Sequence, residues 1–178
     1  MNKILLILLI NTQIQAQIFL SNSGNISFFS ETPLENITAI NDNVSAVFDA
    51  SNNDLVFKLS ISDFIFPNAL MQEHFNENYM DSSVYPKANF VGNIQKFSLG
   101  ELTEYEKNHK IIGVLTIRGI EKNVTINCQL NKANDRLYLK ADFSVLTSDF
   151  DIQVPKVVRN KISKEIKIKV DYELIEKL

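Results

Sequence analysis

The sequence predicts an all-β protein, an antiparallel barrel or sandwich with one short helical insertion. Apolar and polar residues alternate with period two through most of the chain, most clearly over residues 164–174. Turn-forming segments rich in Asn, Asp and Gly separate the alternating segments, around Ser51, Gly119 and Asn134. Only residues 68–80 have helical spacing. Short strands without intervening helices favour an antiparallel barrel or sandwich over alternating strand–helix units.

Eight segments have the periodicity of strands. Apolar side chains occupy every second position, so each predicted strand has one dry face and one wet face. In the last segment, for example, Ile166, Ile168 and Val170 fall on one face, and Lys167 and Lys169 fall on the other. The predicted strands are residues 25–30, 43–50, 53–62, 87–94, 110–119, 123–130, 136–146 and 164–174.

The first sixteen residues are expected to be a secretory signal peptide. Lys3 supplies a positive charge, residues 4–10 form a short apolar run, and Ala16 is a small residue at the expected cleavage point. This run is too short to span a bilayer. We expect cleavage after Ala16 and a periplasmic or secreted mature chain. The alternative is that this segment forms a buried N-terminal strand.

Residues 17–178 are expected to form one barrel domain. The 178-residue chain is 45% hydrophobic and 22% charged, which is a globular composition. Its net charge of -3 argues against a nucleic-acid partner, because binding to phosphates requires a basic surface. Cys128 is the only cysteine, so no intramolecular disulfide can form. No transmembrane span is expected, whereas transient membrane contact and a homodimer stay open.

The helical segment is predicted to begin at Asn68, a favourable N-cap residue. Met71, Phe75 and Tyr79 follow at intervals of four and give the helix an apolar face, with Leu70 beside them. Pro86 prevents the helix from continuing. We expect the apolar face to form a lid or wall over an apolar interior.

Three features could indicate catalysis, but each has a simpler interpretation. Glu73, His74 and Glu77 could bind a metal or act in acid–base chemistry. A zinc site requires three or four ligands, and the only other histidine, His109, lies in a polar stretch expected to be a loop. A water-exposed helix face is therefore favoured. Cys128 falls on an inward strand face, where burial makes a thiol unreactive. We expect no enzymatic activity, no metal and no cofactor.

Inward-facing phenylalanines leave two possibilities for the interior, a filled core or a ligand cavity. A barrel of about eight strands can hold a small ligand along its axis or be filled by side chains. The phenylalanines concerned are Phe48, Phe57, Phe64, Phe66, Phe75, Phe90 and Phe143.

Three segments carry a resemblance to a known family. They are NENYMDSSVYPKANFVG (76–92), GVLTIRGIEKNVTI (113–126) and SDFDIQVPKVVRNKISKEIKIKV (148–170). The second resembles the signature G-x-L-T-I-x-G-x-x-K-x-V of the YceI-like family of bacterial periplasmic lipid-binding proteins, also called polyisoprenoid-binding proteins. The resemblance covers nearly all of residues 17–178. It implies a lipocalin-like antiparallel barrel that holds an isoprenoid or other lipid chain, and it implies no catalytic residue.

These observations predict an exported, non-enzymatic protein that holds a long apolar chain, isoprenoid, quinone-like or other lipid, inside a β-barrel. The alternative is a filled-core barrel that acts as a stress-related structural or protein-interaction module. Polar groups at the mouth are expected to be Thr116, Arg118, Asp149 and Arg159. The predicted ligand-binding residues are Phe48, Phe57, Leu59, Phe64, Phe66, Leu70, Met71, Phe75, Tyr79, Phe90, Leu115, Ile117 and Phe143.

Overall fold

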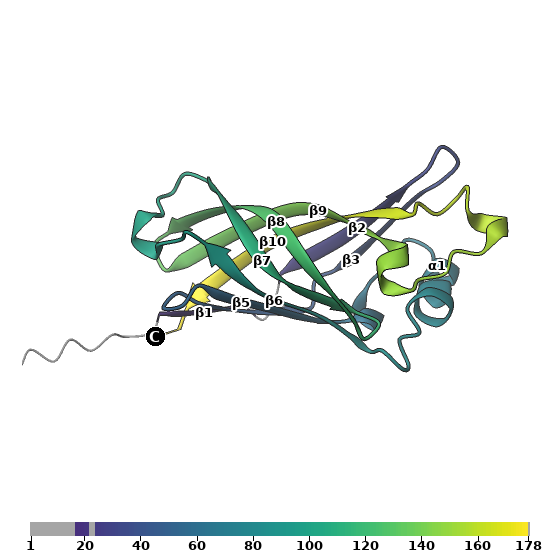
Figure 1. The fold of residues 1–178 in the computed structure, drawn as a ribbon, viewed down its shortest axis with the longest axis horizontal. Coiled ribbons are helices and arrows are strands. Elements are labelled where there is room, and N and C mark those ends of the chain that lie inside the picture. The colour runs from purple at the N-terminus through teal and green to yellow at the C-terminus, as the bar shows by residue number, and fades with distance from the viewer. Residues whose placement is uncertain (1–16, 22–23, 178) are drawn as a thin grey trace, which may run out of the picture.

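A computed structural model describes residues 17–21 and 24–177 (Figure 1). The expected signal peptide and its cleavage after Ala16 lie outside the described residues. The strands are β1 (Ile18–Ser21), β2 (Asn25–Glu31), β3 (Asn36–Asn41), β4 (Val44–Asp49), β5 (Asp54–Ser60), β6 (Lys87–Gln95), β7 (Lys107–Ile117), β8 (Ile120–Ala133), β9 (Arg136–Leu146) and β10 (Glu165–Glu176). The helical elements are η1 (Ile61–Asp63), α1 (Ala69–His74), the π-helical turn η2 (Phe75–Tyr79), η3 (Leu99–Glu101), η4 (Thr147–Phe150) and η5 (Lys156–Val158).

The strands form a closed antiparallel barrel, as predicted. Their order is β1-β4-β5-β6-β7-β8-β9-β10-β2-β3, and a further pairing between β1 and β10 closes the barrel. The pair β1–β4 and the pair β2–β3 share the same register, so together they form one long hairpin. The ten named strands therefore make an eight-stranded barrel. The β2–β3 part of the hairpin extends beyond it, at the end where α1 lies (Figure 1).

Turn chemistry fixes several of the connections. Arg118 and Gly119 alone join β7 to β8, and both have positive φ angles, +50° and +71°. This backbone matches the right-handed twist of a two-residue hairpin. Asn53 and Asn134, which also have positive φ, lie in the turns predicted around Ser51 and Asn134.

The helical insertion begins where the sequence predicts. The Asn68 side chain accepts hydrogen bonds from the backbone N–H groups of Leu70 and Met71, at 2.9 and 3.4 Å. After six α-helical residues the chain continues as a π-helical turn, in which the Met80 N–H donates to the Phe75 carbonyl at 2.9 Å. Residues 61–80, called the lid segment below, lie at one end of the barrel.

Two observed strands, β1 and β3, are not among the eight predicted from the sequence. In β3 the alternation is inverted at its end, because Ile40 is exposed and Asn41 is fully buried. Asn41 is satisfied there, since its side chain donates to the Ser60 carbonyl at 3.0 Å and accepts from the Asn43 N–H at 2.9 Å. The expectation of a loop around His109 is wrong, because that residue lies within β7.

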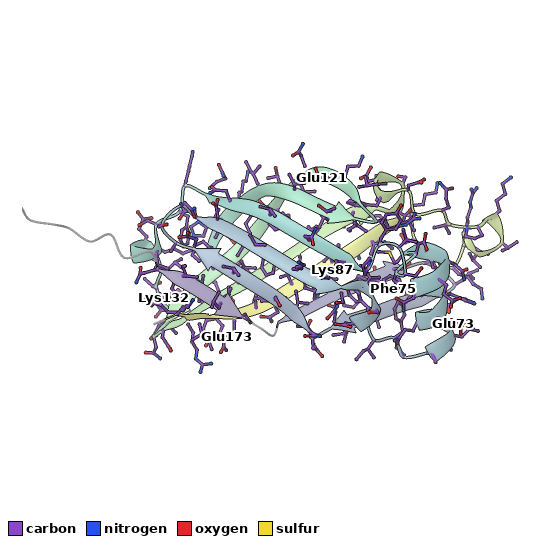
Figure 2. All side chains as sticks on the ribbon, turned by 90° about the horizontal axis from the view of Figure 1, so that it is seen from below. Glu73, Phe75, Lys87, Glu121, Lys132 and Glu173 are labelled. Carbon is purple, nitrogen blue, oxygen red and sulfur yellow. The ribbon has the colours of Figure 1, made fainter. Side chains whose placement is uncertain are left out.

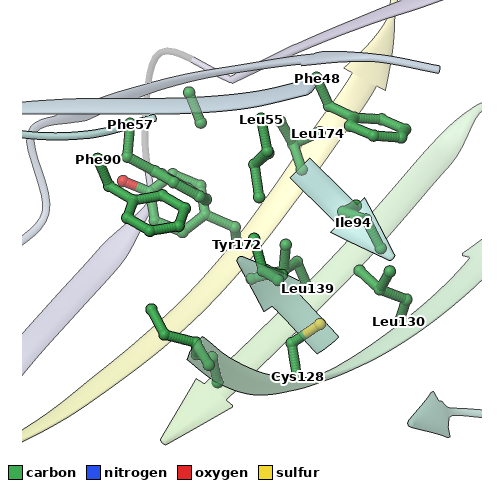
Figure 3. Close-up of a cluster of buried hydrophobic side chains, with 14 of the residues drawn as sticks. Phe48, Leu55, Phe57, Phe90, Ile94, Cys128, Leu130, Leu139, Tyr172 and Leu174 are labelled. Atoms are coloured by element: carbon green, nitrogen blue, oxygen red, sulfur yellow. The ribbon is translucent and has the colours of Figure 1, made fainter. Parts of the chain in front are cut away.

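The half of the barrel away from α1, called the packed end, is filled by side chains. Phe48 is fully buried and packs against Phe19 and Phe97, with ring centroids 6.0 and 5.5 Å apart. Figure 3 shows Phe48, Leu55, Leu174, Ile94 and Leu130 meeting across the barrel interior. These five side chains are at most 1% exposed. The other half, called the open end, is lined differently.

Candidate functional site: an apolar cavity at the open end

A cavity of about 350 Å³ occupies the open end of the barrel. It lies between the inward faces of the strands and the lid segment, and it reaches the surface beside the exposed residues His74 and Lys161. Its volume is near the lower limit of the ~300–1,000 Å³ usual for ligand pockets. Its walls are almost wholly apolar. Besides Tyr79, seven lining residues have polar side chains: Ser30, Glu35, Lys58, His74, Asn89, Thr147 and Lys161.

An aromatic layer forms the floor of the cavity. Phe57 lies 6.4 Å from Phe90 and 4.7 Å from Tyr172, measured between ring centroids. Figure 3 shows these three rings together on one side, with Phe48 and Leu130 of the packed end on the other. Burial raises the pKa of the Tyr172 phenol, so this layer carries no charge at neutral pH. The floor therefore separates the cavity from the packed end.

Two glycines make room for the Phe90 ring. Gly92 and Gly113 are register partners on adjacent strands. A Cβ on Gly92 would lie 2.5 Å from the Phe90 Cζ, and a Cβ on Gly113 would lie 2.7 Å from the same atom. An aromatic ring covering strand glycines is a recognised way to stabilise them. The Phe90 ring therefore lies over β6 and β7 at the level of the floor.

Gly113→Ala is expected to destabilise the protein by about 1–3 kcal/mol, as overpacking does. The new Cβ would lie 2.4 Å from the Val91 carbonyl oxygen, a backbone atom that cannot move aside easily. Gly100→Ala is the matched control, because a Cβ added there would have no atom within 4 Å. Urea denaturation of both variants measures the difference. Equal stabilities would show that the glycine pair is not required.

The lid segment closes the open end with a cluster of four phenylalanines. The Phe75 ring lies 5.4 Å from Phe28, 5.7 Å from Phe64 and 5.0 Å from Phe66. Figure 2 shows Phe75 and Glu73 at the end of the barrel opposite Lys132 and Glu173. Met71 and Tyr79 complete the inner face of the lid segment, as their spacing predicts. Burial raises the pKa of the Tyr79 phenol, which keeps it neutral.

Polar contacts at the rim join the β2–β3 hairpin to the connection between β9 and β10. Lys161 and Glu35 form an ion pair of 3.7 Å, and the Ser163 N–H donates to Ser30 Oγ at 2.8 Å. Lys167 and Glu31 form a further exposed pair at 2.5 Å. Exposed ion pairs add little stability, so these contacts mainly fix the position of the hairpin at the rim.

The structure brings most of the predicted ligand-binding residues to the cavity. Phe48 lies outside it, because that position on β4 belongs to the packed end. Leu70 also lies outside, because it points to solvent from α1 and is 56% exposed. The remaining eleven line the cavity: Phe57, Leu59, Phe64, Phe66, Met71, Phe75, Tyr79, Phe90, Leu115, Ile117 and Phe143.

Several lining residues are not among those predicted from the sequence. Phe28, Ile166 and Ile168 show period-two spacing in the sequence, but their height along the barrel becomes known only from the pairing. His74 lines the rim although it was expected only to face water. None of the expected mouth residues, Thr116, Arg118, Asp149 and Arg159, contributes to the lining; Arg118 instead lies over the Tyr85 ring.

The described residues offer little for metal or nucleophilic chemistry. No three His, Cys, Asp or Glu side chains among them come together as metal ligands. Cys128 is buried, and burial raises the pKa of its thiol to about 12. A thiol with that pKa is protonated at neutral pH and is a poor nucleophile. No helix in residues 17–21 and 24–177 is long and apolar enough to cross a bilayer.

Comparisons with known proteins agree with this architecture. Residues 17–174 match the family model of the YceI-like domain. A polyisoprenoid binding domain from Saccharophagus degradans, implicated in plant cell wall breakdown, has a TM-score of 0.80 at 10% identity, covering 92% of this chain and all of the other. Burkholderia cenocepacia BcnA gives 0.70 at 16%, covering 85% and 95%.

The Campylobacter jejuni YCEI protein gives a TM-score of 0.62 at 17% identity, covering both chains completely. No curated protein matches the sequence significantly. At these identities the structural likeness establishes the fold, whereas the family model matches nearly all of the described sequence. The chain therefore belongs to the YceI-like family.

Proposed function

We propose that this protein is an exported, non-enzymatic binding protein that holds the apolar chain of an isoprenoid, a quinone-like molecule or another lipid. The observation that carries the proposal is the cavity at the open end, enclosed by aliphatic and aromatic side chains above a closed floor. The polyisoprenoid binding domain from Saccharophagus degradans shares the fold, which supports a ligand of this class. The sequence of residues 1–16 supports export.

The energetics of such a site favour an apolar chain. Each methylene removed from water contributes about 0.8 kcal/mol, so one five-carbon isoprene unit contributes roughly 3–4 kcal/mol. Binding must offset the cost of ordering the chain and of lost translational freedom, about 4–15 kcal/mol. A few buried units are enough for this. The aromatic and methionine side chains of the lid segment suit a flexible ligand, because such surfaces can repack.

The filled-core alternative describes the packed end correctly, because side chains fill the barrel interior around Phe48. That half provides the stability of the barrel. A structural or protein-interaction module would not require the second half to enclose an apolar cavity. The cavity thus supports the binding proposal over the alternative.

Ala141→Phe is expected to lower the affinity for an apolar chain at least about ten-fold. Ala141 is 7% exposed and lines the cavity from β9, so a phenylalanine side chain would fill ligand space. Ser144→Phe, on the same strand and exposed, is the matched control. Native mass spectrometry of freshly purified protein and titration with a fluorescent fatty-acid probe measure occupancy. Lipid-free wild-type protein that binds no probe would contradict the proposal.

A further inference from the structure

The depth of the cavity can be obtained from the strands that line it. β9 contributes from Leu139, the register partner of the floor residue Tyr172, to Leu146. Each strand residue advances ~3.3 Å, and barrel strands are tilted by ~35–45°. The seven steps from Leu139 to Leu146 therefore span about 16–19 Å along the barrel axis between floor and rim.

Two estimates of the chain length that fits lie on either side of three isoprene units. With bonds of ~1.5 Å and angles of ~111°, an extended carbon chain advances ~1.25 Å per carbon, so the depth accommodates about 13–15 main-chain carbons. If each carbon occupies a volume like the ~30 Å³ share of a water molecule, the cavity volume of about 350 Å³ holds about 12 of them. An isoprene unit has five carbons, four of them in the main chain, so the depth corresponds to between about three and four units and the volume to about two and a half. The cavity thus suits about three units.

The Phe57 and Phe90 rings that form the floor have no space to move towards the packed end. Below Phe57 and Phe90, Leu55, Ile94 and Leu174 are at most 1% exposed. The glycine pair Gly92 and Gly113 holds the Phe90 ring at its level, since a Cβ on either glycine would lie only 2.5 or 2.7 Å from its Cζ. Protein interiors packed to this extent do not accept further groups without strain.

We propose that Phe90, held in place by the pair Gly92 and Gly113, sets the length of chain that this protein binds. Affinity then rises with chain length up to about three isoprene units and stops rising. This inference rests on the proposed function and narrows its ligand to one whose buried part is short. The remainder of a longer chain would lie outside the rim, where it adds no burial and no affinity.

A series of prenyl alcohols with two, three, four and eight isoprene units tests the proposal on the full chain. Affinity is measured by displacement of a fluorescent fatty-acid probe. For the wild type, the third unit is expected to raise affinity at least about ten-fold over two units, because five carbons become buried. The fourth unit and those beyond it are expected to change affinity less than about three-fold.

Two substitutions are expected to move this limit in opposite directions. Phe90→Ala removes the ring and lowers the floor, so the limit should move from three units to four. Phe90→Leu serves the same purpose if the alanine variant does not fold, as judged by circular dichroism. Gly92→Ala pushes the Phe90 ring towards the rim, so the limit should move to two units. Phe75→Ala, at the lid, is the control; it should weaken all chains alike and leave the limit at three.

Each outcome separates the two proposals. If none of the alcohols binds, the proposed function fails, and the length limit fails with it. If affinity keeps rising through eight units, the length limit is overturned while lipid binding stands. A limit at three units that neither Phe90→Ala nor Gly92→Ala moves would overturn the assignment to Phe90.

Discussion

Phe48→Ala is expected to lower the free energy of unfolding by about 3–5 kcal/mol, the usual cost of truncating a buried phenylalanine. Phe48 is fully buried in the packed end, where its ring contacts Phe19 and Phe97. The loss of stability has two parts: the free energy gained by burying the ring is lost, and a cavity is left behind because the close-packed neighbours relax only partly. Urea denaturation followed by circular dichroism measures the change.

The adjacent residue provides the control. Val47 is 41% exposed on the outer face of the same strand, so Val47→Ala should cost less than about 1 kcal/mol. The folded fraction of Phe48→Ala should bind apolar probes as the wild type does, since Phe48 is not in the cavity lining. A loss below about 1 kcal/mol for Phe48→Ala, or equal losses for both variants, would show that the packed end is not the stability core.

Phe75→Ala is expected to have the opposite profile, with a large loss of affinity and a smaller loss of stability. Phe75 is half-buried, and its ring joins Phe28, Phe64 and Phe66 over the cavity. Removing it exposes the bound chain to water and deletes apolar contact of about 1.5–3 kcal/mol. Affinity for a three-unit prenyl alcohol should fall about ten- to hundred-fold. Probe displacement and urea denaturation, carried out on the same samples, separate the two effects.

Glu77→Ala tests whether the effect belongs to the ring or to the lid segment as a whole. Glu77 lies in the same π-helical turn and is exposed, so its replacement should leave affinity and stability nearly unchanged. If Phe75→Ala keeps full affinity but destabilises the protein as much as Phe48→Ala does, the aromatic cluster is a structural core and not the wall of a binding site.

The barrel architecture followed from the sequence because alternation identifies the dry face of each strand. Ile166, Ile168 and Val170 all point inward in β10, and Asn68 caps α1 as predicted. β3 was missed because Asn41 is buried and Ile40 is exposed, which inverts the expected pattern. A buried polar residue with its own hydrogen bonds gives no alternation signal.

The division of the interior into two halves could not be predicted in this way. Phe48 and Phe57 are inward phenylalanines on paired strands, and their sequence patterns are equivalent. Phe48 faces Leu55 across the pair and belongs to the packed end, whereas Phe57 faces Ala46 and reaches the cavity floor. Periodicity reports which face a residue occupies but not its height along the barrel. Height depends on long-range register, which no local pattern encodes.

The lid segment is attached to β3 by a single bridge. The Ile40 N–H donates to the Ile65 carbonyl at 3.1 Å, and the Ile65 N–H donates to the Ile40 carbonyl at 2.8 Å. The barrel strands β7 and β8, by contrast, are paired along eleven residue positions. Detaching residues 62–80 breaks these two backbone bonds and the side-chain bond from Asn43 to Asp63. It also separates the Phe28 ring from the aromatic rings of the lid segment, but it leaves every ladder of the barrel intact, so it requires less free energy than global unfolding. Amide deuterium uptake would accordingly be fast at Ile65 and slow at Leu139.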